Sequence, residues 1–585
     1  MPADPSRTPI LLLAAVVAAA APSLLAYNVS PSPTFLNQAL ALGTWGGFAL
    51  LLAAGQRSAA GFAASRAAAP VQLALALIAA AALWSGTAGA LPSSLCLSAL
   101  GLLGAAALLV HSGSAACSSD EAGDLFALFS WGFLIAGGLN LAIGLVQVFA
   151  PGLADGDWIA VSNITGRAVG NLRQPNHLSS LLLWAAIGAV ALLEMRRLGR
   201  RAAAAALALL VFAVVLTASR TGLVSVLLLA FWGAADRRLA RFTRVLLLAA
   251  PLVYAVAWLG MAQWAAASSH AFGGAARLAE SDISGSRFGI WANTLELIRQ
   301  HPWAGVGFGE FNLAWTLTPF PGRPVAFFDH THNLPLQLAA ELGLPLAAVV
   351  MALLLWALAR GLRGAWAAPG DEGMARRAAM GMVLMIGLHS LLEYPLWYGY
   401  FLLPAAWAWG FALHPAQPAA RRDLRAPWLV WAGAALVVAA VLSVADYARV
   451  AVIFSARPGL PPLEQRIAEG RRSVLFGHHA DYAAVTSGVP VLDEARAFDR
   501  ATHYLLDTRL MMAWSRALAE QGRLDEARHL AARLREFRKP EAEGFFGVCE
   551  AVTDEADASA SAPPFQCDQP KRSLSWRELL SAGDR

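Results

Sequence analysis

The chain has 585 residues, of which 57% are hydrophobic and 14% are charged, and its mean hydropathy is +0.52. Soluble domains carry about 25% charged residues, so this composition excludes an ordinary soluble protein and predicts an all-α polytopic membrane protein. The net charge of +5 comes largely from short arginine-rich loops, so it bears on topology and does not indicate a nucleic-acid partner. Four cysteines are too few for a disulfide framework, although Cys549 and Cys567 can pair if the tail is exported.

Apolar runs long enough to span a bilayer recur along the chain and predict about 13 transmembrane helices, of which the eighth and twelfth are short. The first run could be mistaken for a signal peptide, but further spans follow at once, so we interpret it as the first membrane anchor. The runs lie at about 10–27, 36–54, 70–86, 93–111, 125–149, 178–195, 202–218, 221–234, 244–264, 333–359, 377–393, 399–413 and 427–446.

Arginine clusters test this number of spans, because loops rich in Arg and Lys stay in the cytoplasm. The clusters fall in alternate loops, at Arg57 and Arg66, Arg196 to Arg201, Arg237 to Arg244, Arg360 to Arg377 and Arg421 to Arg425. With about 13 spans the N-terminus is therefore cytoplasmic and the C-terminal tail lies on the opposite side. Nearly all the unusual polar side chains fall in the segments left outside, namely 150–177, the turn at Arg220, 265–332, 394–399 and everything after Tyr447.

The composition also predicts a domain boundary after the last span. Residues 1–446 form a transmembrane catalytic domain that includes the long outside loop 265–332, and 447–585 form a charged helical domain. In that tail, 505–520 and 523–537 are amphipathic and resemble one tetratricopeptide unit, which must stack on neighbouring helices because one unit cannot bury its own face. A segment near 552–570, rich in Ala, Ser, Asp and Pro, is predicted to be disordered.

The sequence GNLRQPNH, at 170–177, crowds polar side chains just before the sixth span: Asn171, Arg173, Gln174, Asn176 and His177. One interpretation is a capped helix start with a snorkelling arginine. Five hydrogen-bonding side chains so close together also suit recognition of a sugar or phosphate. We therefore treat the motif as a candidate binding site.

Two further arginines lie in outside segments. Arg220, in TASRTG, lies between two apolar helices and is either a snorkelling membrane anchor or a functional residue. Its outside position is contrary to the positive-inside rule, which favours the functional interpretation. Arg287 heads a predicted short amphipathic helix that ends near Pro302. The glycines of HPWAGVGFG, at 301–309, lack the Lys-Ser/Thr pair and the preceding strand of a phosphate loop, so we expect them to let the backbone run close to a lipid or glycan.

The segment GRPVAFFDHTHNLPLQ, at 322–337, precedes the tenth span and holds His330, His332 and Asn333. A third ligand at a recognised spacing is missing, so we expect no metal here. His332 is either a helix cap or a general base or orienting group. In EYPLWY, at 393–398, an aromatic belt explains most of the pattern, but Glu393 and Tyr394 can also face a sugar-binding cleft.

Together these motifs resemble the O-antigen ligase/polymerase (Wzy/WaaL) superfamily of bacterial envelope glycosyltransferases over roughly residues 120–450. Within it the pattern is most similar to PglL-type protein O-oligosaccharyltransferases, to which GNLRQPNH points. The residues that carry the resemblance are GNLRQPNH at 170–177, TASRTG at 217–222, SRFGIW and HPWAGVGFGEF within 286–311, HTHNLPLQLAAELG at 330–343 and EYPLWY at 393–398.

The resemblance implies a GT-C-like fold in the bacterial inner membrane, with the active site and C-terminal domain in the periplasm. It implies an inverting transferase that needs no metal or other cofactor and moves an oligosaccharide en bloc from undecaprenyl diphosphate to Ser or Thr hydroxyls of a periplasmic protein such as a pilin. By motif position, Arg220 and Arg287 would hold the diphosphate and His332 would be catalytic. Gln174 and either Tyr394 or Tyr398 match positions that the family uses for activity.

Two other classes of function compete with this interpretation. An O-antigen ligase or Wzy-type polymerase would share the chemistry but act on lipopolysaccharide or another glycan. A transporter of lipid-linked sugars would predict internal repeats and charged residues within spans, whereas the spans are nearly free of charge apart from Glu194 and Glu341. The tail can also dock the protein acceptor.

Overall fold

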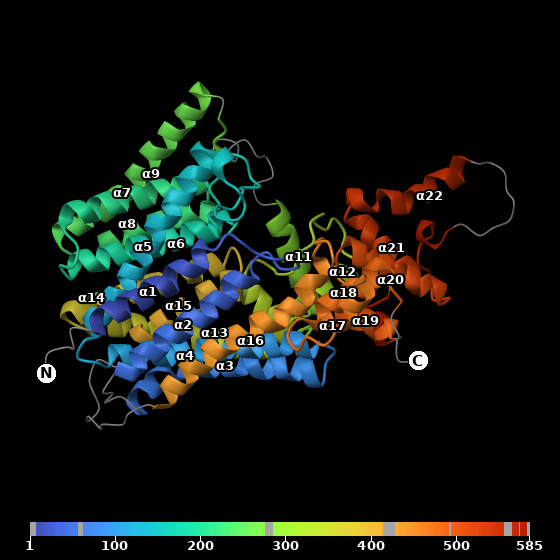
Figure 1. Ribbon diagram of the computed structural model, residues 1–585, viewed down its shortest axis with the longest axis horizontal. Coiled ribbons are helices and arrows are strands. Elements are labelled where there is room, and N and C mark those ends of the chain that lie inside the picture. The colour runs from blue at the N-terminus through green and yellow to red at the C-terminus, as the bar shows by residue number, and fades with distance from the viewer. Residues whose placement is uncertain are drawn as a thin grey trace. The chain divides into compact units, whose positions relative to one another are not determined.

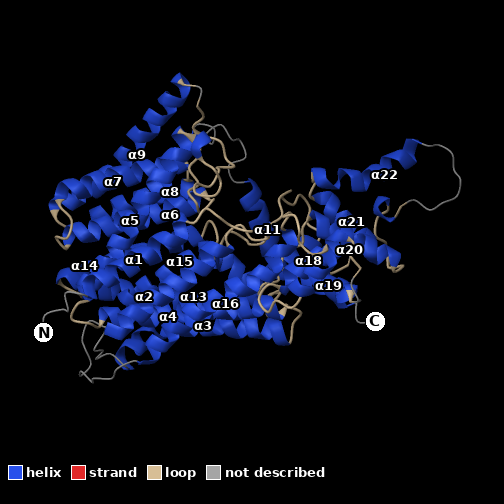
Figure 2. Cartoon of the chain, viewed as in Figure 1, coloured by secondary structure: helices blue, strands red, loops and turns tan. Residues whose placement is uncertain are grey.

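The computed structural model describes residues 7–55, 62–268, 270–274, 285–413, 427–490, 493–554, 564–572 and 574–581. Within these ranges every regular element is a helix and no strand occurs, as the all-α prediction requires (Figure 1, Figure 2). Arg57 and Arg421 to Arg425, used above for topology, lie outside the described residues.

The helices of the apolar part of the chain are α1 (Arg7–Leu24), α2 (Phe35–Gly55), α3 (Phe62–Thr87), α4 (Ser93–Cys117), α5 (Ala122–Phe149), η1 (Pro151–Leu153), α6 (Pro175–Glu194), α7 (Arg200–Thr217), α8 (Arg220–Ala235), α9 (Arg241–Ala267), α11 (Gly285–Gln300), α12 (Phe311–Leu317), α13 (Leu334–Ala367), α14 (Gly370–Ser390), η2 (Pro395–Trp397), α15 (Gly399–Ala412) and α16 (Pro427–Ala451). Those that follow are η3 (Val452–Phe454), α17 (Leu463–Gly470), α18 (Gly477–Ser487), α19 (Glu494–Thr502), α20 (Thr508–Glu520), α21 (Leu524–Glu536), η4 (Pro540–Ala542), α22 (Glu543–Asp554), η5 (Phe565–Cys567) and α23 (Trp576–Ser581).

Each apolar run predicted from the sequence coincides with one helix, from α1 to α9 and from α13 to α16. Among the described residues, nine helices are long and apolar enough to cross a membrane: α2 to α7, α9, α13 and α16. The helices α1 and α8 are apolar but shorter, and α14 and α15 belong to neither group. The protein is therefore a multi-pass helical membrane protein, and the number of 13 spans stays a prediction.

The chain divides into two compact units. Unit 1 comprises residues 1–76, 102–283 and 352–444, and unit 2 comprises 77–101, 284–351 and 445–585. The boundary expected after residue 446 lies close to the passage from unit 1 to unit 2 at 444–445. Unit 2, however, also contains the segment with His330 and His332, which the sequence analysis assigned to the transmembrane domain.

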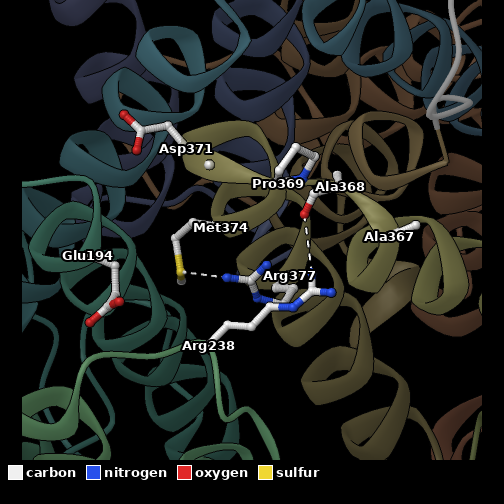
Figure 3. A pocket seen from close by; sticks show the side chains of 9 residues that line it. Glu194, Arg238, Ala367, Ala368, Pro369, Asp371, Met374 and Arg377 are labelled. Carbon is white, nitrogen blue, oxygen red and sulfur yellow. Dashed lines mark hydrogen bonds between the residues drawn. The ribbon is translucent and has the colours of Figure 1, made fainter.

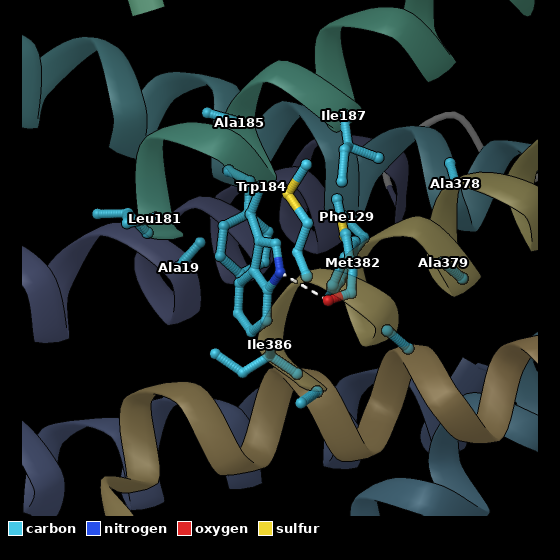
Figure 4. Packing of buried hydrophobic residues seen from close by; sticks show 14 of the residues in the cluster. Ala19, Phe129, Leu181, Trp184, Ala185, Ile187, Ala378, Ala379, Met382 and Ile386 are labelled. Atoms are coloured by element: carbon cyan, nitrogen blue, oxygen red, sulfur yellow. Dashed lines mark hydrogen bonds between the residues drawn. The ribbon is translucent and has the colours of Figure 1, made fainter. Parts of the chain in front are cut away.

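The core of unit 1 surrounds α6. Its sequence is apolar all round rather than on one stripe, which is the pattern of a helix buried on every side, and 94% of its spanning window is buried. Trp184, which is 1% exposed, packs against residues of α5 and α14, and its indole Nε1 donates to the backbone oxygen of Met382 at 3.0 Å (Figure 4). This bond gives the one polar atom of the side chain a partner inside the apolar core.

Small residues let the helices of unit 1 approach closely. A Cβ added to Gly113 of α4 would lie 1.9 Å from the carbonyl oxygen of Trp407, and one added to Gly410 of α15 would lie 1.9 Å from that of Val110. The two helices therefore cross backbone to backbone, with a glycine on each side. Since lipid tails are as apolar as leucine, such close van der Waals contact is a main source of helix association in a membrane.

Unit 2 has a core of its own, which joins the segment around α11 and α12 to the tail helices α18 to α23. Arg323, 6% exposed, lies at its centre: its guanidinium pairs with Glu536 at 2.8 Å and stacks over Trp315 and Phe537 at 4.9 and 4.8 Å. It also donates to the carbonyl oxygens of Trp315, Thr316 and Thr318. Burial lowers the pKa of Arg323 to about 10, so it stays protonated at neutral pH. The tail is thus packed into the same core as the loop before His330.

The tail helices agree with the sequence in part. The predicted pair 505–520 and 523–537 is α20 and α21, which pack against each other, and α18 packs on α19 and α20. Cys549 and Cys567 form a disulfide, as the sequence allowed. The disordered segment was predicted too wide, because α22 extends to Asp554 and η5 covers Phe565–Cys567; residues 555–563 lie outside the described residues.

Candidate active site

The motifs GNLRQPNH and TASRTG of unit 1 form helix starts of the same design. Arg173 and Ala218 have left-handed backbones, with φ of 57° and 48°, and each is followed by a capping residue. Gln174 accepts from the His177 N–H at 2.8 Å, and Ser219 accepts from the Gly222 N–H at 3.0 Å. The predicted capped helix start is therefore confirmed at Gln174.

These two helix starts are tied together. The Asn176 side chain accepts from the Ser219 hydroxyl at 2.6 Å and donates to the Glu393 carboxylate at 3.1 Å, and Ser179 donates to the Ser219 hydroxyl at 3.2 Å. The N-termini of α6 and α8 consequently lie side by side, and half-buried Arg220 is the first residue of α8. The positive ends of both helix dipoles and the Arg220 guanidinium lie at this end of unit 1, which therefore favours an anion.

Side chains of α6, α14 and α15 form a buried cluster of polar and aromatic groups. The Tyr400 hydroxyl lies 3.1 Å from Nδ1 of His177, and the Ser180 hydroxyl lies 2.8 Å from Nδ1 of His389, which is fully buried. Tyr398 contacts the His177 ring edge to face at 4.6 Å, and Tyr394 stacks on Tyr398 at 6.0 Å. Tyr398 thus lies against His177, and Tyr394 lies against Tyr398. Polar groups at membrane depth are costly, so such a group is itself a sign of function.

Asn171 and Arg173 tie segments of unit 1 together. Asn171, 1% exposed, donates to the carbonyl oxygens of Leu24 and Trp158 and accepts from the Ala160 N–H. The Arg173 guanidinium donates to the carbonyl oxygen of Ala26. In these bonds both side chains hold segments of the backbone together. A substrate-binding role for either residue stays a prediction.

In unit 2 the histidine segment begins α13 in the same way. His332 has a left-handed backbone, with φ of 55°, and Asn333 accepts from the Leu336 N–H at 3.1 Å. Asn333 therefore caps the helix, and His332 is the residue before this cap.

Charged and aromatic groups surround His332. Nδ1 of His330 lies 3.1 Å from the Asp329 carboxylate. Desolvation alone would raise the pKa of Asp329, but the neighbouring imidazoles of His330 and His332 bring it below its usual value. Arg287 lies in the first turn of α11, as predicted, and one turn later Trp291 donates to the Thr331 carbonyl oxygen at 2.9 Å. Unit 2 thus joins the Arg287 helix to the His332 segment.

The glycine-rich loop packs on α13, and its expected approach to a lipid or glycan stays a prediction. Pro345 cannot donate to the Glu341 carbonyl oxygen, which instead accepts from the Gly307 N–H at 3.1 Å. The Ala340 carbonyl oxygen accepts from the Val306 N–H at 2.8 Å. Gly343, with φ of 77°, breaks the helix at this point. The loop satisfies the backbone groups that the break exposes.

A cavity of about 400 Å³ lies in unit 1, away from the motifs (Figure 3). Its lining includes Glu194, Arg238, Asp371 and Arg377, and Arg377 pairs with fully buried Asp236 at 2.7 Å. Glu194 ends α6 and Asp371 begins α14, so the cavity is at the opposite ends of these helices from Asn176 and His389. It is therefore separate from the candidate site.

Within the described ranges no three His, Cys, Asp or Glu side chains are grouped so as to hold a metal ion. Three family matches cover most of the apolar chain and part of the tail. Residues 205–351 match O-antigen ligases, residues 168–193 match protein glycosylation ligases, and residues 377–543 match the C-terminal region of membrane-bound polymerases described as virulence factors. Over these residues the chain is similar to the O-antigen ligase superfamily.

Two curated proteins, both from Acinetobacter baylyi, are also similar to the chain. A general O-oligosaccharyltransferase is 26% identical over 258 residues, which is 42% of this chain and 43% of the relative. A ComP-specific O-oligosaccharyltransferase is 27% identical over 286 residues, which is 48% of each. The chain thus matches less than half the length of either relative.

The structure groups the predicted site residues within each unit. Unit 1 brings together Gln174, Asn176, His177, Arg220 and the two tyrosines, and unit 2 brings together Arg287, His330, His332 and Asn333. Sequence reasoning missed His389, Ser180, Tyr400 and the linking role of Ser219. A histidine inside an apolar run, such as His389, was the available signal.

Proposed function

We propose that this protein is an O-antigen ligase superfamily member that transfers an oligosaccharide en bloc from undecaprenyl diphosphate to Ser or Thr hydroxyls of periplasmic proteins such as a pilin. The observation that carries the chemistry is the pair of joined helix N-termini with Arg220 in unit 1. The choice of a protein acceptor rests on the two oligosaccharyltransferase relatives and on the match of 168–193 to protein glycosylation ligases.

In the proposed reaction the acceptor oxygen attacks the anomeric carbon, and the bond from that carbon to the phosphate oxygen breaks with inversion. The leaving diphosphate keeps the bonding electrons. Arg220, the positive ends of the α6 and α8 dipoles, and Arg287 stabilise its charge. His332 accepts or orients the proton of the hydroxyl, which is a poor nucleophile while protonated. The residues present suit this chemistry without a metal, so we expect none to be required.

We also propose the orientation that the arginine loops predict. The N-terminus is cytoplasmic in the inner membrane, and the motifs and the tail face the periplasm. The Cys549–Cys567 disulfide supports this orientation, because disulfides persist in the periplasm and are rare in the cytosol.

The test is glycan transfer in cells that supply an undecaprenyl-linked oligosaccharide and a pilin-like acceptor. We expect the wild type to glycosylate the acceptor and His332→Ala to lose on the order of 100-fold or more of that activity, as for removal of a general base. His270→Ala, which changes an exposed histidine of unit 1, is the matched control. An active His332→Ala at equal expression would contradict the role of His332.

A second candidate is ligation of O-antigen to lipopolysaccharide, favoured by the match of 205–351 to O-antigen ligases. It uses the same donor and leaving group and differs only in the acceptor. Modified lipopolysaccharide with unmodified protein, in the same cells, would assign the chain to this function instead.

A further inference from the structure

His332 owes its unusual backbone to a neighbour that the sequence analysis did not select. A left-handed conformation costs a residue other than glycine about 1–2 kcal/mol, so surrounding bonds must hold it. The Asn333 side chain caps the helix that follows. The bonds that act on the preceding peptide groups lie at Thr331, whose side chain and backbone are fully buried.

Three groups fix Thr331. Its N–H donates to Oε1 of Gln337 at 2.7 Å, its carbonyl oxygen accepts from Trp291 at 2.9 Å, and its hydroxyl donates to the Asn333 carbonyl oxygen at 2.8 Å. His332 lies between two residues that are pinned in this way. These bonds hold its backbone, and with it the direction in which the His332 side chain leaves the chain.

Gln337 is oriented in turn by Glu341. The other end of its amide, Nε2, donates to the Glu341 carboxylate at 2.9 Å, and the two residues are 2% and 7% exposed. They are four residues apart on α13 and therefore share one face, and helical side chains point toward the N-terminus, where Thr331 lies. Each end of the amide thus has one partner, which fixes which end faces Thr331.

We infer that Gln337 is a positioning residue for His332: its amide bridges the Glu341 carboxylate to the Thr331 N–H and so holds the imidazole in the orientation that transfer needs. This inference rests on the proposed function, since it assumes that His332 acts on the acceptor hydroxyl. Gln337 itself need not touch a substrate.

The bridge needs an acceptor at one end and a donor at the other, which suggests a specific pair of variants. In Gln337→Leu both bonds are lost at every pH. In Gln337→Glu a protonated carboxyl can accept from the Thr331 N–H and donate to Glu341, just as the amide does. An ionised one has no proton to donate and faces a second carboxylate. Gln337→Glu should therefore work in acid and fail as the pH rises.

The experiment measures two quantities on the purified full-length protein: hydrogen exchange of peptides that contain the Thr331 amide, and the kinetics of glycan transfer. We expect Gln337→Leu to speed the exchange and to lower kcat about 10- to 100-fold with KM for the donor nearly unchanged, the size of effect that misplacement by about 1 Å produces. Near pH 6, Gln337→Glu should match the wild type in both quantities. Near pH 8, it should instead match Gln337→Leu in both quantities. The control is Gln300→Leu, since Gln300 also donates to a glutamate, Glu296, but on the exposed face of α11.

The inference is overturned if Gln337→Leu leaves the exchange unchanged, or if it speeds the exchange while kcat stays at the wild-type value. A Gln337→Glu variant that follows Gln337→Leu at every pH would also overturn it. A wild type that modifies lipopolysaccharide instead of protein contradicts only the proposed acceptor, and kcat is then measured in that reaction. If the wild type transfers to neither, the proposed function fails, and the exchange result alone decides whether Gln337 holds Thr331.

Discussion

The helix starts of α8 and α13 share a local design but present different groups. In both, a left-handed residue precedes a capping residue: Ala218 before Ser219, and His332 before Asn333. In α8 the candidate functional residue, Arg220, follows the cap and lies among the N–H groups of the helix. In α13 the candidate, His332, is the left-handed residue itself. The same turn type thus places an arginine at the start of a helix in unit 1 and a histidine just before the start of a helix in unit 2.

The two units also differ in what supports these turns. In unit 1 the start of α8 is bonded to the start of α6 through Asn176, inside an apolar helical bundle. In unit 2 the segment before α13 rests on a core that includes Arg323 and the tail helices. This difference predicts that substitutions at the α8 start change catalysis with little effect on stability, whereas substitutions beneath His332 destabilise unit 2.

The largest effect on glycan transfer is expected at Arg220. We expect Arg220→Gln to lower glycan transfer on the order of 100- to 1,000-fold, because it removes a fixed cation that faces the charge of the leaving group. The Ser219 cap remains, so thermal stability should stay within about 1 kcal/mol of the wild type. Arg299→Gln, at an exposed arginine of α11, is the control. Full activity of Arg220→Gln would indicate that Arg220 serves only as a membrane anchor.

Arg323 tests the support of unit 2. Arg323→Ala removes the partner of Glu536 and the donors to three carbonyl oxygens, so we expect unit 2 to lose about 3–5 kcal/mol of stability. Hydrogen exchange should rise in 311–328 and 524–537 but not in α6, whose core belongs to unit 1. An equal rise in α6 would mean that the two cores unfold together. Arg299→Ala, which breaks only an exposed ion pair, should leave both unchanged.

Gly343 tests the docking of the glycine-rich loop. A Cβ there would lie 2.3 Å from the Trp303 carbonyl oxygen, and φ is +77°, so we expect Gly343→Ala to cost about 2–4 kcal/mol from strain and overpacking together. Gly322 has a φ of +66° but nothing within 4 Å of an added Cβ, so Gly322→Ala should cost only the backbone term of about 1–2 kcal/mol. Thermal unfolding of both variants measures the difference. Equal costs would show that the loop can move aside.

The smallest expected effect is a loss of stability of unit 2 in mild acid. Burial lowers the pKa of His529 to about 4, and its neutral ring is bonded at both nitrogens, to the Leu317 carbonyl oxygen and to the Leu574 N–H. The folded pKa lies below the unfolded value of about 6.5, so stability is complete above pH 6.5 and falls as the pH drops toward 4. The loss between pH 7 and pH 5 should be about 2 kcal/mol.

Proteolysis of α21 at each pH measures this loss. His529→Gln keeps a donor for Leu317 without titrating near pH 6, so it should lose less stability in acid than the wild type. The same pH dependence in both proteins would assign the effect to other groups, such as His479, whose pKa burial also lowers to about 4.

The sequence by itself determined the class of the protein, the residues at which its apolar helices lie, and most of the polar positions that begin α6, α8 and α13. Hydropathy and helix capping are local properties, so spacing along the chain is enough to read them. The amphipathic helices α20 and α21 could be predicted from the sequence for the same reason.

Only the tertiary structure decided how these pieces are held. Left-handed backbones at Arg173, Ala218 and His332 are locally unfavourable, so no local pattern predicts them, and long-range bonds to other segments stabilise them. The glycines of 301–309 fit a close approach to any surface, and the break at Gly343 and Pro345 determined that this surface is α13. The tail, which the sequence separated as a domain, shares its core with the His332 segment, because apolar burial joins residues regardless of their distance along the chain.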